Sequence, residues 1–274
     1  KKYGGGGDII YLDQQHGADD NDGLTKTTAV KTLQKANERA ESRHIKDICF
    51  TSLYKVTGTE VWDLGGKTVH RGTAGYIIEL ADDSASITLG NIVIDAAMWG
   101  SAETQAETDS IIKAANGGTI VLKSGAILQN NNATQFGSGI LANNGVKITM
   151  EDGAIIRNNS NRNYELGGGI LIGNGSTFTM NGGEISGNSA NGGGGVAVIG
   201  ASMVMNGGII SNNSTYRTSG QGSYGAGVYV ADYANASGGD TLFKPTPASF
   251  EMNGRTISGN TALDYGGGVL TFPQ

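Results

Sequence analysis

The chain has 274 residues, of which 46 are glycine and 3 are proline, and it carries a formal net charge of −6 with a pI near 5.1. An acidic chain without a cluster of Lys and Arg offers no electrostatic footprint for nucleic acid, and the lack of a G-X-Y period excludes collagen. No apolar run reaches the length that a membrane span needs. The single cysteine, Cys49, lies in the apolar segment DICF and is expected to be a buried, unpaired thiol.

Two elements are predicted in the first forty residues. Residues 8–12 (DIIYL) are typical of a short strand. Residues 29–40 place apolar side chains on one face at helical spacing, and Thr27 or Thr28 stands where it can cap the first turn. The sequence therefore predicts a strand followed by one amphipathic helix.

An acidic turn, residues 16–23 (HGADDNDG), lies between these two elements. Its carboxylates make Asp20 and Asp22 candidate calcium ligands. An EF-hand would need an acidic ligand where Ala18 stands and a glutamate where Ala29 stands, so that motif is not expected. We expect no cofactor, with a solvated turn here as the alternative to calcium binding.

Weakly repetitive strands are predicted after the helix. Four segments alternate apolar and polar residues with a period of two: 47–50 (DICF), 67–70 (KTVH), 76–80 (YIIEL) and 86–95 (SITLGNIVID). A longer joint at 95–109 carries Trp99 and four carboxylates. We interpret residues 47–118 as irregular coils of a repeat structure.

A strict repeat begins at residue 119. Five copies align without gaps over their first thirteen residues, at 119–131 (TIVLKSGAILQNN), 147–159, 177–189, 202–214 and 249–261. A glycine-led block such as GSGILA follows each copy, at 137–142, 167–172, 193–198, 225–230 and 266–271. The joints vary in length while the strands repeat, which is typical of a solenoid that accepts insertions between coils.

Alternation within each copy assigns side chains to the interior. The second, fourth and ninth residues are expected to point inward: Ile120, Leu122, Ile127, Ile148, Met150, Ile155, Phe178, Met180, Ile185, Met203, Met205, Ile210, Phe250, Met252 and Ile257. The twelfth residue is asparagine in all copies: Asn130, Asn158, Asn188, Asn213 and Asn260. Amides stacked about 4.8 Å apart can hydrogen-bond along the axis, so we interpret this column as structural.

The predicted fold is an all-β parallel β-helix of about seven coils. The first coil of such a solenoid exposes its apolar interior and an unpaired edge, so the helix at 29–40 is expected to cap it. We predict a single domain, residues 1–274. Its parts are an N-terminal strand and capping helix (1–46), irregular coils (47–118) and regular repeats with loop insertions (119–274).

The repeat resembles that of right-handed parallel β-helices of the pectate-lyase-like kind. The pairing of I-S-G-N or I-x-N-N with G-G-G-[IV] is similar to the GGA[ILV]/FxxN repeats of polymorphic outer-membrane adhesins and to β-helix regions of Gram-positive surface proteins, which residues 10–36 also resemble. The resemblance covers nearly the whole chain and implies a secreted or cell-surface bacterial protein, often in a carbohydrate context. It carries no catalytic residue with it, because the G-H-G motif of polygalacturonases and the R-x-P-x-x-R motif of pectate lyases are both missing.

The joints before the second block hold the candidate binding residues. Stacking is expected to align these joints along one edge of the solenoid, with aromatic, charged and arginine side chains of the kind that bind sugars. The candidates in these joints are Arg162, Tyr164, Glu165, Tyr216, Arg217, Tyr224, Asp264 and Tyr265, and Tyr233 lies nearby, just past a second block. Tyrosines that only cover long loops are the alternative interpretation. Asp264 with Glu165 or Asp232 is the carboxylate pair to test for glycoside hydrolysis.

Three functions remain open from the sequence. The first is an adhesin-like surface module whose loop edge binds glycans or a host surface. The second is a glycoside hydrolase or polysaccharide lyase, and the third is a structural stalk or filament segment. Because the chain stops directly after a predicted strand, end-to-end self-association or a further C-terminal region is expected to cover the last coil.

Overall fold

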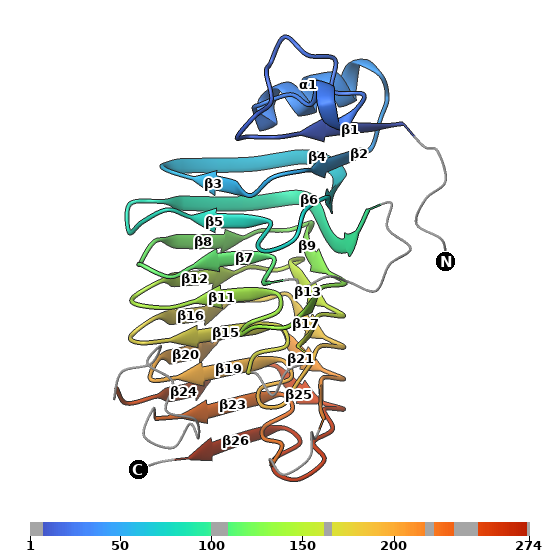
Figure 1. The fold of residues 1–274 in the computed structure, drawn as a ribbon. Helices are drawn as coiled ribbons and strands as arrows, with labels where there is room; N and C mark the ends of the chain where they lie inside the picture. Colours follow the sequence, from blue (N-terminus) through green and yellow to red (C-terminus); the bar gives the residue numbers. More distant parts are fainter. Residues whose placement is uncertain (1–7, 100–108, 162–165, 217–221, 233–245, 273–274) are drawn as a thin grey trace.

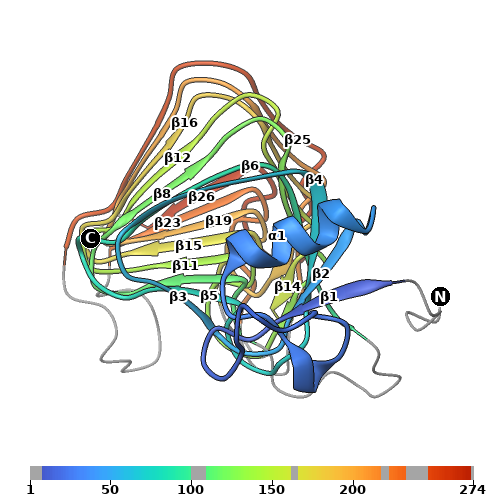
Figure 2. The ribbon, with the colours of Figure 1, turned by 90° about the horizontal axis from the view of Figure 1, so that it is seen from above.

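The structure, a computed structural model, describes residues 8–99, 109–161, 166–216, 222–232 and 246–272. In these residues the chain is almost entirely β, and short strands stack in parallel along one axis with the helix α1 (Leu33–Ser42) at the N-terminal end (Figure 1). Seen along the axis, the coils superimpose and enclose a common interior (Figure 2). The arrangement fits a parallel β-helix.

The largest sheet of the described residues has 14 strands in two rows, which the long strands β4 and β6 join. Its members are β1 (Ile9–Leu12), β2 (Asp47–Phe50), β4 (Thr59–Arg71), β6 (Ser86–Met98), β8 (Thr119–Leu122), β9 (Ala126–Gln129), β12 (Lys147–Met150), β13 (Ile155–Arg157), β16 (Thr177–Met180), β17 (Glu184–Ser186), β20 (Ser202–Met205), β21 (Ile209–Ser211), β24 (Ser249–Met252) and β25 (Thr256–Ser258).

The described residues add two further sheets, of eight and four strands. The first contains β3 (Tyr54–Val56), β5 (Ile78–Leu80), β7 (Ile112–Ala114), β11 (Ile140–Ala142), β15 (Ile170–Gly173), β19 (Val196–Ile199), β23 (Val228–Ala231) and β26 (Val269–Phe272). The second contains β10 (Asn132–Ala133), β14 (Ser160–Asn161), β18 (Ser189–Ala190) and β22 (Ser214–Thr215), which the sequence pattern did not predict. Strands of successive coils pair in parallel in all three sheets.

The N-terminal helix begins later than predicted. A short 3₁₀ helix, η1 (Lys26–Thr28), is capped by Thr25, and α1 starts at Leu33 with Thr32 as its N-cap. The prediction that Thr27 or Thr28 caps the helix is wrong because Val30 forms a strand-like bridge to Leu12 instead of entering the helix. The capping role is confirmed, since Leu33, Ala36 and Ala40 are buried and α1 lies across the end of the interior (Figure 2).

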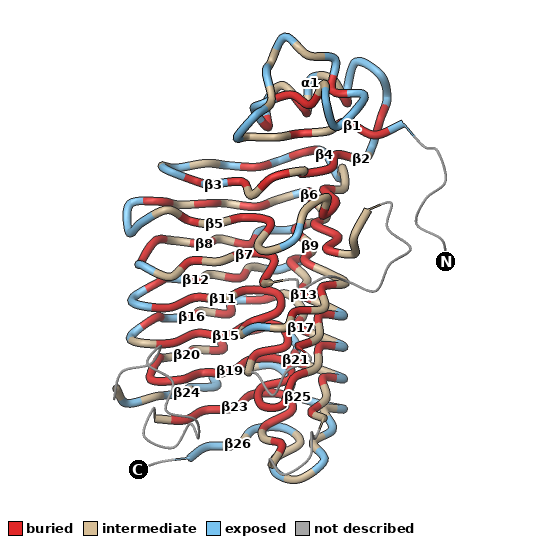
Figure 3. Tube along the Cα trace, in the orientation of Figure 1, coloured by how far each residue is buried: buried red, intermediate tan, exposed pale blue. Residues whose placement is uncertain are grey.

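The inward columns are largely as predicted, with a shift of one residue in two copies. Pairing aligns Ile156 with Ile185, so the inward residues of β9 and β13 are Leu128 and Ile156. Ile127 and Ile155 therefore point outward, and the prediction for these two was wrong. The pairing register shows one residue more between Leu122 and Ile127, and between Met150 and Ile155, than between the paired residues Met180 and Glu184 of the next copy, which an alignment without gaps misses. Burial is complete in the central coils and weakens in the last, where Met252 is 44% exposed (Figure 3).

The same shift moves the asparagine ladder. Its members are Asn131, Asn159, Asn188, Asn213 and Asn260. In each step the Oδ1 atom of one residue accepts the backbone N–H of the previous one, as for Asn213 and Asn188 at 3.0 Å. Asn130 and Asn158, predicted to belong to the ladder, instead adopt left-handed backbone conformations with φ of 61° and 54°. Asparagine tolerates this conformation better than most residues, which explains the doublet Asn-Asn in these copies.

Candidate functional site

The predicted loop edge is only partly within the described residues. Arg162, Tyr164, Glu165, Arg217 and Tyr233 lie outside them. Tyr216, Tyr224, Asp264 and Tyr265 are described, and isolated bridges link Leu166, Gly192, Tyr224 and Tyr265 in successive coils. The joints therefore line up along one edge where the structure describes them.

The tyrosines of this edge stack on one another. The rings of Tyr224 and Tyr265 lie 5.8 Å apart with an interplanar angle of 9°, and Tyr229 also stacks on Tyr224, at 5.7 Å. Tyr224 and Tyr229 belong to a second apolar cluster on the outer face of the eight-stranded sheet, which includes Leu171, and Phe272 packs edge-on against both rings. Burial, followed by the nearby Tyr224, raises the pKa of Tyr229 to about 12. Tyr224 thus contacts two other tyrosine rings and is half-buried, whereas Tyr265 is 56% exposed and has the more accessible ring.

The two described carboxylates of the predicted hydrolytic pair hold loops in place. Asp264 Oδ2 accepts hydrogen bonds from the backbone N–H and the hydroxyl of Ser223, at 2.9 and 3.0 Å. Asp232 Oδ1 accepts the N–H of Ala248 at 2.5 Å. Their third candidate partner, Glu165, lies outside the described residues. Through these contacts Asp264 and Asp232 both have a structural role.

The acidic turn is also organised by local hydrogen bonds. Asp22 Oδ1 accepts from the N–H of Leu24 at 3.0 Å and from the hydroxyl of Thr28 at 2.6 Å. Within the described ranges, no three His, Cys, Asp or Glu side chains converge so that they could hold a metal ion. Calcium binding at Asp20 and Asp22 stays a prediction that the turn geometry does not require.

A polar column that the sequence reading missed follows the solenoid axis. It lies on the outer face of β2, β4, β6, β9, β13, β17, β21 and β25, and we call this surface the axial face. The register places one outward residue from each coil in the column: Cys49, His70, Asp95, Gln129, Arg157, Ser186, Ser211 and Ser258. The polar side chains come from residues that are far apart in the sequence and only meet through stacking.

Hydrogen bonds connect the middle of the column. Arg157 Nε donates to Gln129 Oε1 at 2.9 Å, and Gln129 Nε2 donates to Asp95 Oδ2 at 3.0 Å. Asn130 Nδ2 donates to the same carboxylate oxygen at 2.8 Å. Gln129 and Arg157 are half-buried, so their remaining donors and acceptors face solvent.

The upper end of the column is covered. His70 Nε2 lies 2.6 Å from Asp47 Oδ1, and the ring of Trp99 packs on the imidazole at 4.3 Å. His70 and Asp95 are 8% and 7% exposed. The accessible part of the axial face therefore begins at Gln129 and runs toward the C-terminal coils.

A cleft of about 310 Å³ adjoins this accessible part. Its walls carry the carboxylates of Asp152 and Glu184, the guanidinium of Arg255 and the aliphatic side chains of Ile155 and Ile209. Ile209 is 44% exposed, and in the described part of the chain neither carboxylate forms an ion pair. Carboxylates, guanidinium and exposed apolar surface along one line are the groups that bind hydroxyl-rich ligands.

A signal for the axial face was present in the sequence. In every copy the polar residue stands directly after the inward aliphatic residue, as Arg157 follows Ile156 and Ser186 follows Ile185. The outward positions of the first strand in each copy are mostly uncharged, as at Val121 and Thr149. The polar side chains of the axial face lie on the second strand of each copy.

Comparison with known proteins found no family model, no curated protein and no solved structure that matches this chain. No helix in the described ranges is both long and apolar enough to cross a membrane.

Proposed function

We propose that this protein is a secreted or cell-surface bacterial β-helix module that binds carbohydrate, and that the axial face is its binding surface. This proposal includes right-handed winding, about seven coils and kinship with pectate-lyase-like and adhesin-like β-helices. The observation that carries it is the hydrogen-bonded column Asp95–Gln129–Arg157 beside the cleft of Asp152, Glu184 and Arg255.

The repeat of the solenoid suits an extended glycan. Coils stack about 4.8 Å apart, so an axial row offers one polar group per coil to a linear ligand. Arg157 can donate to ring hydroxyls while Glu184 accepts from them, and Ile209 offers an apolar surface to a sugar ring. The tyrosine edge remains a second binding surface to test, with Tyr265 as its accessible ring.

A glycan array combined with a reducing-sugar assay on the same glycans tests this function. We expect binding to extended glycans without release of product. Binding to none of them, with the protein folded by circular dichroism, would overturn the proposal.

Hydrolysis or lysis of the bound glycan is the second candidate function. The observation in its favour is that Asp152 and Glu184 line one cleft and form no ion pair within the described residues. Glycosidases place two carboxyl groups about 5 to 9.5 Å apart around the scissile bond. Product that disappears in both Asp152→Asn and Glu184→Gln would establish this function, whereas loss in Asp264→Asn would point to the loop edge.

A stalk or filament segment is the third function, and the N-terminal cap does not favour it. Head-to-tail stacking needs two open ends, but α1 lies across the interior at one end (Figure 2). The opposite end exposes Met252, Val269 and Phe272, so pairing of two copies through their last coils is the form of self-association that we would test. A molar mass from light scattering that rises with concentration beyond that of a dimer would favour this function.

A further inference from the structure

Most strand edges at the N-terminal end of the solenoid are covered by other parts of the chain. β2 pairs with β1, and β1 in turn is bonded to Gly23 and Val30 through the backbone of Tyr11. The edge of β3 is covered by one side chain, because the Gln14 amide accepts the Lys55 N–H at 2.7 Å and donates to the Lys55 carbonyl at 3.0 Å. Thus even on the three-residue strand β3 the outward backbone groups of Lys55 are hydrogen-bonded.

The first half of β4 is the exception. Residues 59–63 pair with β6 on one side, while β2 pairs only with the second half of β4, at 68–71. Ser86 N–H donates to the Gly58 carbonyl, so in the alternating parallel ladder Thr59, Val61 and Asp63 direct their N–H and C=O groups away from β6. In the described part of the chain no hydrogen bond to these backbone groups is present.

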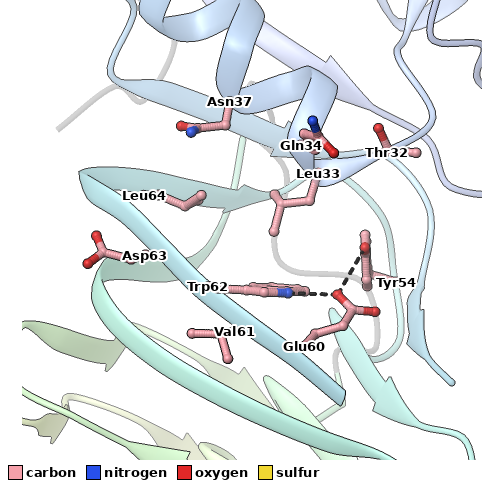
Figure 4. Close-up of a pocket in the computed structure, with 10 residues that line it drawn as sticks. All are labelled: Thr32, Leu33, Gln34, Asn37, Tyr54, Glu60, Val61, Trp62, Asp63 and Leu64. Carbon is pink, nitrogen blue, oxygen red and sulfur yellow. Dashed lines mark hydrogen bonds between the residues drawn. The ribbon is translucent and has the colours of Figure 1, made fainter. Parts of the chain in front are cut away.

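A cleft of about 340 Å³ lies beside this edge, between β4 and the first turns of α1. Its floor holds Trp62, whose Nε1–H donates to Glu60 Oε2 at 2.8 Å, and Tyr54, whose hydroxyl lies 3.2 Å from the same oxygen (Figure 4). Gln34 and Leu33 of α1 face it from above (Figure 4). Val61 is 71% exposed, so a second strand could reach this edge.

The charge of the cleft identifies the kind of partner. The residues that line it include the carboxylates Glu60 and Asp63 and no Lys, Arg or His. A second copy of the chain at the same edge would bring two pairs of carboxylates together, which is unfavourable. A basic segment would gain both the main-chain ladder and the opposite charge.

We propose that the free edge of β4, residues 59–63, binds an extended peptide segment that carries lysine or arginine and joins the sheet as an added strand. Main-chain hydrogen bonds to Thr59, Val61 and Asp63 supply the affinity, as in other strand-addition complexes. Glu60 and Asp63 select the basic side chains of the partner. This site lies at the opposite end of the molecule from the glycan cleft and does not depend on the proposed function.

Fluorescence polarisation with labelled acetyl-KVTVKV-amide tests the site, with acetyl-EVTVEV-amide as the charge control. We expect the basic peptide to bind and the acidic one to bind at least tenfold more weakly. The variant Val61→Pro removes the outward N–H of the edge and should weaken binding at least tenfold, whereas Val61→Thr should not. Proline is tolerated here because this N–H makes no ladder bond.

A second measurement leaves the protein unchanged. The same peptide with alternate backbone amides N-methylated can pair along only one of its edges, so methylation of one set should abolish binding and methylation of the other should not. The proposal would be overturned if the basic peptide did not bind or if both methylated forms bound equally. A dimer detected by light scattering and abolished by Val61→Pro would overturn it as well. A Val61→Pro variant that folds and binds like the wild type would do the same.

Discussion

The guanidinium of Arg71 donates from Nη2 to the side-chain oxygen Oδ1 of Asn131 at 3.1 Å, at the head of the asparagine ladder. Arg71 has no solvent-exposed surface, and its other N–H groups donate to the carbonyl oxygens of Ala96, Gly75 and Asp109. Burial lowers its pKa to about 10, although the nearby Asp109 acts to raise it. An arginine therefore takes the position above the first asparagine, where the irregular coils meet the regular ones.

Removing this guanidinium should destabilise the junction of the two regions. Arg71→Ala removes the guanidinium donors to the carbonyl oxygens of Ala96 and Gly75 and to Asn131 Oδ1, while the Asp109 carbonyl keeps its hydrogen bond from Asn131 Nδ2. We expect a loss of about 3 kcal/mol or more in unfolding free energy. Urea unfolding followed by circular dichroism measures it, and Arg43→Ala, at the exposed C-cap residue of α1, is the control. Equal midpoints for the two variants would contradict this role.

Two asparagine columns allow a matched test of burial. Asn188 is completely buried, donates to Ile156 O and Asn213 Oδ1, and accepts from Asn159. Asn206 belongs to an exposed column and bonds to Asn181 Oδ1 at 3.0 Å. We expect Asn188→Ala to cost about 3 kcal/mol because the Ile156 carbonyl and the Asn159 N–H lose their buried side-chain partner, and Asn206→Ala to cost less than about 0.5 kcal/mol. Thermal unfolding of both variants measures the difference; similar losses would show that the buried ladder has no special role.

The repeat made much of this architecture predictable. Period-two alternation predicted the inward columns, since Phe178 and Met180 are buried as expected, and the recurring asparagine predicted an axial ladder. The register in the first two copies could not be read from the residues alone. Asn-Asn occurs there twice, and which of the two bonds along the axis depends on the length of the preceding turn.

The sites were harder to predict than the fold. Tyr224 and Tyr265 were correctly placed on one edge, but that they stack face to face depends on the spacing of the coils. The column of Asp95, Gln129 and Arg157 joins three coils, so no local sequence motif predicts it. The free edge of β4 is a property of pairing and has no sequence signal at all.

The thiol of Cys49 should be inert in the folded protein. Burial raises its pKa to about 12, with Lys26 acting weakly in the opposite direction. At pH 8 almost no thiolate is then present, and the sulfur has no exposed surface. We expect no reaction with a thiol-directed disulfide reagent in the native state and one equivalent in denaturant. Ser258→Cys on the exposed last coil should react at once; rapid labelling of native Cys49 would contradict its burial.

The N-terminal cap should weaken in acid through Asp19. This carboxylate accepts the N–H groups of Lys31 and Thr32 and the Thr32 hydroxyl. Burial acts to raise the pKa of Asp19, but these hydrogen bonds outweigh it and hold the pKa below its usual value. The stability it contributes is therefore complete above about pH 4 and is lost as the pH falls through the lowered pKa.

The variant Asp19→Asn should thus be less stable than the wild type at pH 7 by about 1 kcal/mol and equally stable near pH 2. Thermal unfolding across this range measures the difference. Asp20→Asn, whose exposed side chain makes no hydrogen bond within the described residues, is the control. A difference between Asp19→Asn and the wild type that does not change with pH would contradict this explanation.

The glycan array, probed with three variants in parallel, tests the central claim most directly. Arg157→Ala alters the axial face, Tyr265→Ala alters the tyrosine edge, and Arg43→Ala removes the same charge from the C-cap of α1, far from both. We predict that Arg157→Ala loses at least tenfold in binding to the glycans that the wild type retains, while the other two bind as the wild type does. Full binding by Arg157→Ala together with loss in Tyr265→Ala would contradict the axial face as the binding surface and assign it to the tyrosine edge.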